Sequence, residues 1–143
     1  MALTISTADV KRKCMLASAD TTYDASIAAL IAEMQPAVEY TLDDDYLGDT
    51  ANAGLQAVLR LGVLELIAAE FLAQRFREAG YAEEVQIGGI RLGQVWERGK
   101  VLSEQGSARL APFRKAASVF DADSGLMSTT RDRERQMTVE EAI

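Results

Sequence analysis

The side chains that could carry out catalysis are few in this sequence. The 143-residue chain contains no histidine and a single cysteine, Cys14, so the residue type that most often serves as general base and as metal ligand is missing. A serine or Cys14 would need a lysine or a carboxylate as its activating base, and no Ser-x-x-Lys pattern stands at a predicted helix start. The sequence therefore predicts no enzyme activity and no cofactor, and Cys14 is expected to be a core residue.

One acidic segment has part of the spacing of a calcium-binding loop. Asp43, Asp45 and Gly48 match the first, third and sixth positions of such a loop. The twelfth position, which needs a bidentate acid, is occupied by Gly54, and Leu47 stands where an oxygen ligand is required. The segment is therefore interpreted as a solvated acidic turn, and no metal site is expected.

The overall charge narrows the classes of partner. The net charge is −7 at pH 7, with 48% hydrophobic and 26% charged residues, a composition typical of one globular domain. Almost all of the excess acidity lies in residues 1–50. An acidic balance argues against a surface that grips nucleic acid, which needs a clustered basic face. It suits a surface past which DNA moves without sticking.

Neither a signal peptide nor a membrane span is indicated. The basic residues at 11–13 are followed by no sustained apolar stretch, and a lone cysteine cannot form an internal disulfide. The longest apolar run, residues 57–73, is interrupted by Arg60, Glu65 and Glu70, which a helix would scatter around its circumference. We therefore expect synthesis in the cytoplasm and no membrane partner.

Two amphipathic helices are predicted in the first part of the chain. Ser6 begins a short helix, from which Val10 faces inward. A second helix runs to about Leu42, and Pro36 inside it removes a backbone donor, so a kink or a restart is expected near residues 32–35. Its apolar residues recur at helical spacing and form one stripe: Ile27, Leu30, Ile31, Met34 and Val38.

The third predicted helix, from about Asn52 to Ala79, is apolar on nearly every side. Gly80 supplies its left-handed stop. It carries a dense set of apolar side chains: Leu55, Val58, Leu59, Leu61, Val63, Leu64, Leu66, Ile67, Phe71, Leu72 and Phe76. Such a helix must be covered all round. A second chain that covers part of it and a central position in the chain's own core are both open at this point.

A glycine-rich segment with a different character follows this helix. Residues 81–95 combine alternating apolar residues with glycines, which predicts an extended arm or hairpin with one short β element. Gly88 and Gly89 do not indicate a nucleotide site, because they follow a helix and no Lys-Ser or Lys-Thr succeeds them. Trp96 comes directly after the arm and is either an interface anchor or an ordinary core residue.

The last part of the chain predicts one more helix and a tail. Gly99, Gly106 and Pro112 divide a helical stretch, so the helix is placed at about 103–118. Residues 119–143 are poor in aromatics and mixed in charge, which predicts a tail that becomes ordered on a partner. The fold class is therefore mainly α. A small bundle of about four helices, with the extended arm near 81–95, forms one domain over 1–118.

Four segments, taken in order, are similar to a known family. They are Ile5–Lys11, the helix start Asp24-x-x-Ile27-x-x-Leu30-Ile31, the long apolar helix ending at Phe76, and the stretch from Ile87-Gly88-Gly89 through Leu110-Ala111-Pro112-Phe113-Arg114. This order resembles the head–tail connector, or adaptor, proteins of tailed bacteriophages, which form a ring beneath the portal after DNA packaging. The resemblance covers residues 3–118 and is one of pattern, not of a catalytic motif.

The resemblance implies a structural subunit of the virion at the head–tail junction, synthesised in the host cytoplasm. It implies a homo-oligomeric ring of portal-matched, twelvefold symmetry. The portal protein and a tail or stopper protein would be its partners, and DNA would pass through the lumen without sequence recognition. Subunit-interface candidates are Leu61, Leu64, Phe71, Val85, Ile87, Ile90, Leu92 and Trp96. Portal-docking candidates in the tail are Phe120, Leu126, Met127, Arg131, Arg133 and Arg135.

A second interpretation stays open beside the connector. The chain could be a helical protein-binding or DNA-packaging regulatory module that acts as a dimer, with the long apolar helix as the dimer seam. The mass of the assembled species at physiological salt separates the two interpretations, because a ring contains many more copies than a dimer.

Overall fold

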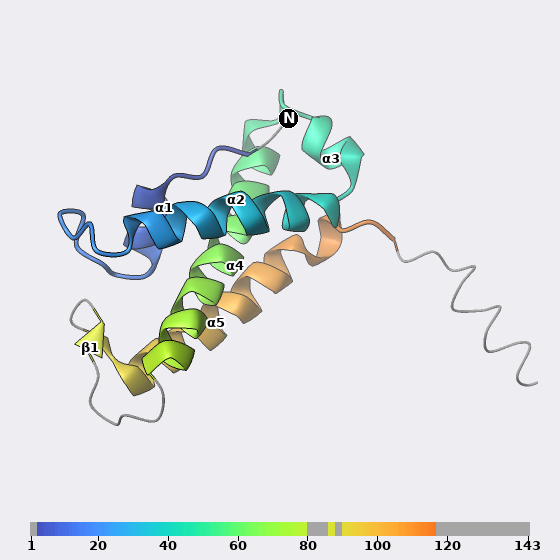
Figure 1. The fold of residues 1–143 in the computed structure, drawn as a ribbon. Helices are drawn as coiled ribbons and strands as arrows, with labels where there is room; N and C mark the ends of the chain where they lie inside the picture. Colours follow the sequence, from blue (N-terminus) through green and yellow to red (C-terminus); the bar gives the residue numbers. More distant parts are fainter. Residues whose placement is uncertain (1–2, 80–85, 88–89, 117–143) are drawn as a thin grey trace, which may run out of the picture.

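The computed structural model describes residues 3–79, 86–87 and 90–116, which form a small helical bundle (Figure 1). Its elements in chain order are α1 Thr7–Lys13, α2 Asp24–Tyr40, α3 Asp44–Gly48, α4 Ala53–Ala79, β1 Gln86–Ile87, β2 Ile90–Arg91, α5 Leu92–Leu110 and the 3-10 helix η1 Ala111–Phe113. The mainly α class predicted from the sequence is confirmed. The predicted tail, 119–143, lies outside the described residues.

Local hydrogen bonds fix both ends of α1. Ser6 and Asp9 form a capping box at the helix start that was predicted from Ser6. At its end the Leu16 N–H donates to the Lys11 carbonyl at 2.9 Å, and Met15 takes a positive φ of 60°, which is the Schellman arrangement. Val10 and Cys14 are buried as expected, and Leu16 is buried as well.

α2 is one continuous helix that includes Pro36, so the restart predicted as one alternative near residues 32–35 does not occur. The proline leaves the carbonyl of Ala32 without its helical donor. Both residues are exposed, so water can replace the missing bond and the helix continues. On the inward side the buried Gln35 donates from its amide to the Leu3 carbonyl. This hydrogen bond holds the N-terminal segment across α2.

α4 runs through the centre of the bundle (Figure 1). Each of α1, α2, α3 and α5 packs against it, and most of its apolar residues lie in the chain's own core: Leu59, Val63, Leu64, Ile67, Ala68, Ala69, Phe71 and Leu72. A central core helix therefore accounts for the all-round apolar pattern. Leu64 and Phe71 are fully buried in this core, so assigning these two residues to a subunit interface does not agree with the structure.

α4 and α5 lie side by side, run in opposite directions and approach closely at glycines (Figure 1). A Cβ at Gly62 would lie 2.6 Å from Leu110 Cγ, and a Cβ at Gly106 would lie 2.9 Å from the Gly62 carbonyl oxygen. Close packing between the helices thus offsets the low helix propensity of these glycines. α5 begins at Leu92 and ends at Leu110, so the predicted helix over 103–118 is wrong at both boundaries.

A short backbone bridge joins the end of α5 to the end of α2. The Asp43 N–H donates to the Phe113 carbonyl at 2.8 Å, and the Lys115 N–H donates to the Thr41 carbonyl at 2.9 Å. These bonds flank Leu42, which forms an antiparallel β-bridge with the residue after η1. The bridge therefore ties together two segments that are far apart in the sequence.

β1 and β2 form a two-residue antiparallel ladder at the other end of the α4–α5 pair, with Ile87 opposite Ile90. The predicted arm or short β element is thus a hairpin directly before α5. Among the residues that the structure describes, no helix combines the length and the apolar character needed to cross a bilayer.

Candidate functional site

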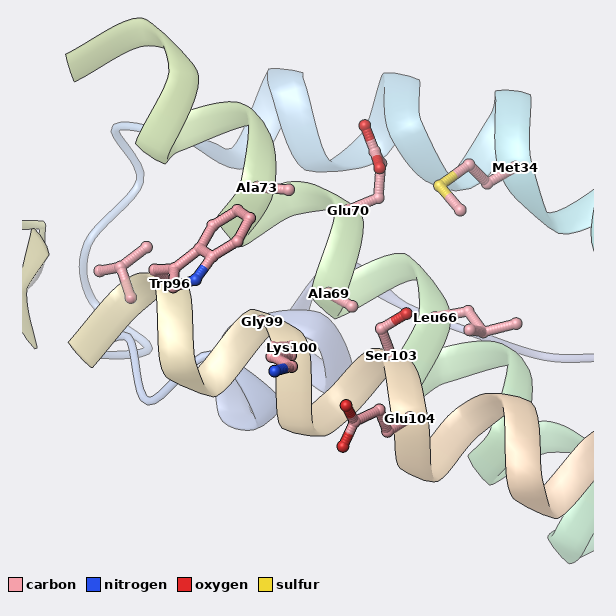
Figure 2. Close-up of a pocket in the computed structure, with 11 residues that line it drawn as sticks. Met34, Leu66, Ala69, Glu70, Ala73, Trp96, Gly99, Lys100, Ser103 and Glu104 are labelled. Atoms are coloured by element: carbon pink, nitrogen blue, oxygen red, sulfur yellow. The ribbon is translucent and has the colours of Figure 1, made fainter. Parts of the chain in front are cut away.

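A groove lies between α2 and α5, over the middle of α4 (Figure 2). Its volume is about 520 Å³. α4 and α5 supply most of the wall, and α2 supplies Met34 at one edge. The groove is a concave and largely apolar surface in the described part of the chain, which makes it a candidate for binding a partner.

The floor of the groove is low because its residues are small. Ala69 and Ala73 face it from α4, and Gly99 faces it from α5 (Figure 2). A Cβ at Gly99 would already lie 3.5 Å from the Ala69 carbonyl oxygen and 3.5 Å from Leu72 Cβ. The two helices therefore meet beneath the groove, and their small side chains leave the space above them open.

Trp96 forms one wall of the groove and remains 53% exposed. Its ring packs against Phe76 of α4, with 5.0 Å between the ring centroids and an angle of 41° between the planes. A tryptophan that is held on one side and open on the other is typical of an anchor in a protein contact. Of the two roles left open by the sequence, this exposure favours the anchor.

Polar side chains stand along the rim of the groove. Lys100, Ser103 and Glu104 are exposed residues of α5, and Glu70 of α4 accepts a hydrogen bond from Arg77 at 2.7 Å. The rim therefore carries both signs of charge around an apolar floor, which is the usual anatomy of a protein–protein contact. Such a site fits a protein segment that buries apolar side chains.

The fold accounts for the two features that the sequence analysis tested for chemistry, Cys14 and the acidic turn. Burial raises the pKa of the Cys14 thiol to about 12, and its Sγ lies 3.7 Å from the Ala68 carbonyl oxygen. Cys14 therefore stays a neutral core thiol at neutral pH. The acidic turn is helical, and Asp43 caps α3 by accepting from the Asp45 N–H at 3.0 Å. In the part of the chain that the structure describes, no cluster of candidate metal ligands occurs.

The predicted interface residues fall into separate places. Trp96 lines the groove, and Leu61 is half-buried on α4. Ile87 and Ile90 lie on β1 and β2, and Leu92 is the first residue of α5. The remaining predicted residues lie outside the described part of the chain, where the structure does not test them: Val85, Phe120, Leu126, Met127, Arg131, Arg133 and Arg135.

Most of the groove was not identified from the sequence. One signal was present, because Leu66, Ala69 and Ala73 recur at helical spacing on one side of α4. Periodicity shows that these residues share a face, but it does not show where another helix will cross that face. Of the rim residues of α5, Lys100 lay before the start of the predicted helix. Ser103 and Glu104 lay within it, but their spacing gave no signal that they border a groove.

A scan against protein-family models, a search of curated proteins and a search of solved structures each find no match to this chain. The function is therefore inferred from the residues and the geometry of the chain itself.

Proposed function

We propose that the chain is a structural head–tail connector subunit of a tailed phage, which assembles with further copies into a ring and performs no reaction. The observation that supports an assembly role is the apolar groove with its half-exposed Trp96. Apolar surface of this kind is stabilised when a protein segment covers it. The resemblance in the order of segments supplies the identity of the assembly.

The shape of the groove favours a ring over a dimer. A twofold dimer brings the same patch of both copies together. Two hollows placed face to face would leave a void between them, so the groove is a poor seam for such a contact. A head-to-tail contact, in which a protruding part of one copy enters the groove of the next, repeats from copy to copy, and it forms a ring when the rotation between copies closes.

The proposed ring sits at the head–tail junction of the virion. The portal protein binds on one side, a tail or stopper protein binds on the other, and DNA passes through the lumen. The subunit number follows the portal in this proposal, and residues 119–143 contact the portal. These partners come from the resemblance, whereas the groove addresses only the contact between copies.

The mass of the assembled full-length chain tests the proposal. We expect native mass spectrometry at physiological salt to find a closed oligomer. Replacing Trp96 with alanine should weaken association about 30-fold, as for loss of an interface anchor worth about 2 kcal/mol. A second variant, Ser103→Arg, places a long side chain at the groove mouth from an exposed position and should weaken association without removing a packing contact.

Val101→Ala is the matched control for these variants. Val101 is an exposed apolar residue of α5 that does not line the groove, so this variant should assemble like the parent chain. Circular dichroism confirms that each variant keeps its helices. A parent chain that is monomeric at all concentrations would overturn the proposal, and a dimer would support the regulatory module instead. Unchanged assembly of both groove variants would exclude the groove as the contact.

A further inference from the structure

Charge is strongly segregated in this molecule. Residues 14–59 contain no lysine or arginine, and their acidic residues lie on α2, α3 and the loops beside them: Asp20, Asp24, Glu33, Glu39, Asp43, Asp44, Asp45 and Asp49. Basic residues collect elsewhere, along α1, one edge of α4 and the flank of α5 that is turned away from the groove: Arg12, Lys13, Arg60, Arg98 and Arg109. We call this second surface the basic face.

Asp9 organises one half of the basic face. Its Oδ1 accepts from Arg12 at 3.0 Å, and its Oδ2 accepts from Arg60 at 2.7 Å. The Asp9 side chain is 14% exposed, whereas those of Arg12 and Arg60 are 72% and 37% exposed. Hydrogen bonds, above all from the Ser6 backbone N–H, hold the pKa of Asp9 below its ordinary value. The carboxylate therefore stays charged beneath the two guanidinium groups.

Glu65 organises the other half in the same way. Arg109 Nε donates to Oε1 at 3.1 Å and to Oε2 at 2.9 Å, and Lys13 Nζ lies 3.9 Å from Oε1. The Glu65 side chain is 1% exposed, whereas those of Lys13 and Arg109 are 28% and 42% exposed. Arg98 Nη2 donates to the Lys13 carbonyl at 3.3 Å, which joins the flank of α5 to the end of α1.

In both halves the carboxylate is less exposed to solvent than the cations that contact it. Five cations meet two carboxylates, so three positive charges are unbalanced, and solvent reaches the cations far more than the acids. The buried Glu65 and the half-buried Asp9 fix the positions of the cations. This reduces the side-chain entropy that a ligand would have to remove. This is a preorganised cationic surface on a chain whose net charge is acidic.

We propose that the basic face binds the phosphate backbone of duplex nucleic acid without reading its sequence. Arg98 and Arg109 are separated by about 16 Å along α5, close to the rise of about five base pairs. Arginine and lysine are the usual donors to phosphate oxygens, and such contacts carry no sequence information. This proposal departs from the expectation based on net charge, because an average over the chain does not show the segregation of the charges.

The proposed binding of duplex nucleic acid does not depend on the proposed ring. The orientation of the subunit towards DNA in the lumen rests on that proposed function. If the chain forms the proposed ring, the basic face is the one turned towards DNA in the lumen, and the acidic α2–α3 side is turned away. The groove lies on the opposite flank of α5 from Arg98 and Arg109, so a neighbouring copy can occupy it without covering the basic face.

Fluorescence anisotropy of a labelled duplex of mixed sequence, titrated with the full chain over a series of low salt concentrations, tests the inference. We expect binding that weakens with salt, with a slope of log K against log salt of about −3, from about −0.9 for each phosphate neutralised. The double variant Lys13→Gln, Arg98→Gln should reduce this slope by about 2. It leaves Arg109 in place, so the buried Glu65 keeps its closest partner.

Lys115→Gln is the matched control, because Lys115 is an exposed cation whose Nζ lies 4.4 Å from the ring centroid of Tyr40 on α2, and it belongs to neither the groove nor the basic face. It should leave the slope unchanged. Equal slopes for the double variant and the control, or no salt-dependent binding by the parent chain, would overturn the inference. Binding to vesicles containing phosphatidylserine without binding to the duplex would overturn it as well. Native mass spectrometry of the same samples separates the two proposals. A ring that does not bind DNA would contradict this inference alone, and a monomer that binds DNA would contradict the ring alone.

Discussion

Met15 holds a backbone conformation that glycine usually occupies. Its φ of 60° places it in the left-handed region, directly after α1, where the side chain crowds the following carbonyl at a cost of about 1 kcal/mol. The Leu16 N–H still reaches the Lys11 carbonyl, and Leu16 is buried in the core. Packing of the residue after the turn therefore keeps Met15 in a strained conformation.

Met15→Gly should raise the free energy of unfolding by about 0.5 to 1 kcal/mol, because glycine adopts this conformation without strain. Urea unfolding followed by circular dichroism measures the change. Ala8→Gly is the control, since Ala8 is an exposed residue within α1, where glycine should lower stability by a similar amount. If both variants lose stability equally, the conformation of Met15 carries no strain.

The elements that could be predicted from the sequence are those with local end signals. α4 was predicted from Asn52 to Ala79 and runs Ala53–Ala79, because Asn52 Oδ1 accepts from the Leu55 N–H at its start and Gly80 follows its end. α1 was found from its capping residues in the same way. Local chemistry decides such boundaries, and a single sequence shows local chemistry directly.

The elements and surfaces that could not be predicted depend on contacts between helices. The glycines of α5 indicate a break when α5 is considered alone, and only the presence of α4 makes them packing positions. The groove depends on where α2 crosses α4, and the basic face depends on α1 lying against Glu65 of α4. Trp96 was identified as a candidate, but its exposure could not be derived from its spacing.

Gly106→Ala should lower the free energy of unfolding by about 1 to 3 kcal/mol. The added Cβ would lie 2.9 Å from the Gly62 carbonyl oxygen, so α4 and α5 must separate, and this loss exceeds the gain of about 1 kcal/mol in helix propensity. Gly54→Ala is the matched control near the start of α4. Its Cβ would meet only Asn52 Oδ1 at 3.7 Å, so it should be neutral or stabilising.

Thermal unfolding of both glycine variants measures these differences. The unfolding midpoint of Gly106→Ala should fall below that of the parent chain, and that of Gly54→Ala should equal or exceed it. A Gly106→Ala variant as stable as Gly54→Ala would mean that the close approach of the two helices is not needed for the fold.

At the scale of the whole molecule, the described residues form an inner core and two distinct outer surfaces. The buried core of the described residues extends from Leu3 to Leu110, and Phe113 packs against it. The groove and the basic face lie on opposite flanks of α5. A subunit with two such surfaces can contact a neighbour and a polyanion at the same time. This arrangement supports the proposed assembly and gives the subunit a defined orientation.

Truncation after Ser118 should leave the midpoint of thermal unfolding within about 2 °C of that of the full chain, because the described core is formed by earlier residues. Calorimetry measures the midpoint. In the proposed assembly the truncated chain still forms rings but no longer binds the portal. Deleting residues 1–5 is the control. It removes Leu3, whose N–H donates to Glu39 at 2.7 Å, and should lower the midpoint clearly. A large loss for the C-terminal truncation would extend the core beyond residue 118.

The bridge at Leu42 also determines how the molecule responds to mechanical load. A pull on the chain beyond Ala116 first meets the hydrogen bond from the Lys115 N–H to the Thr41 carbonyl, and then the bond from the Asp43 N–H to the Phe113 carbonyl. Tension is therefore passed to the end of α2 before it reaches α5. The helix that carries both outer surfaces is thus shielded from force applied at its own C-terminal side.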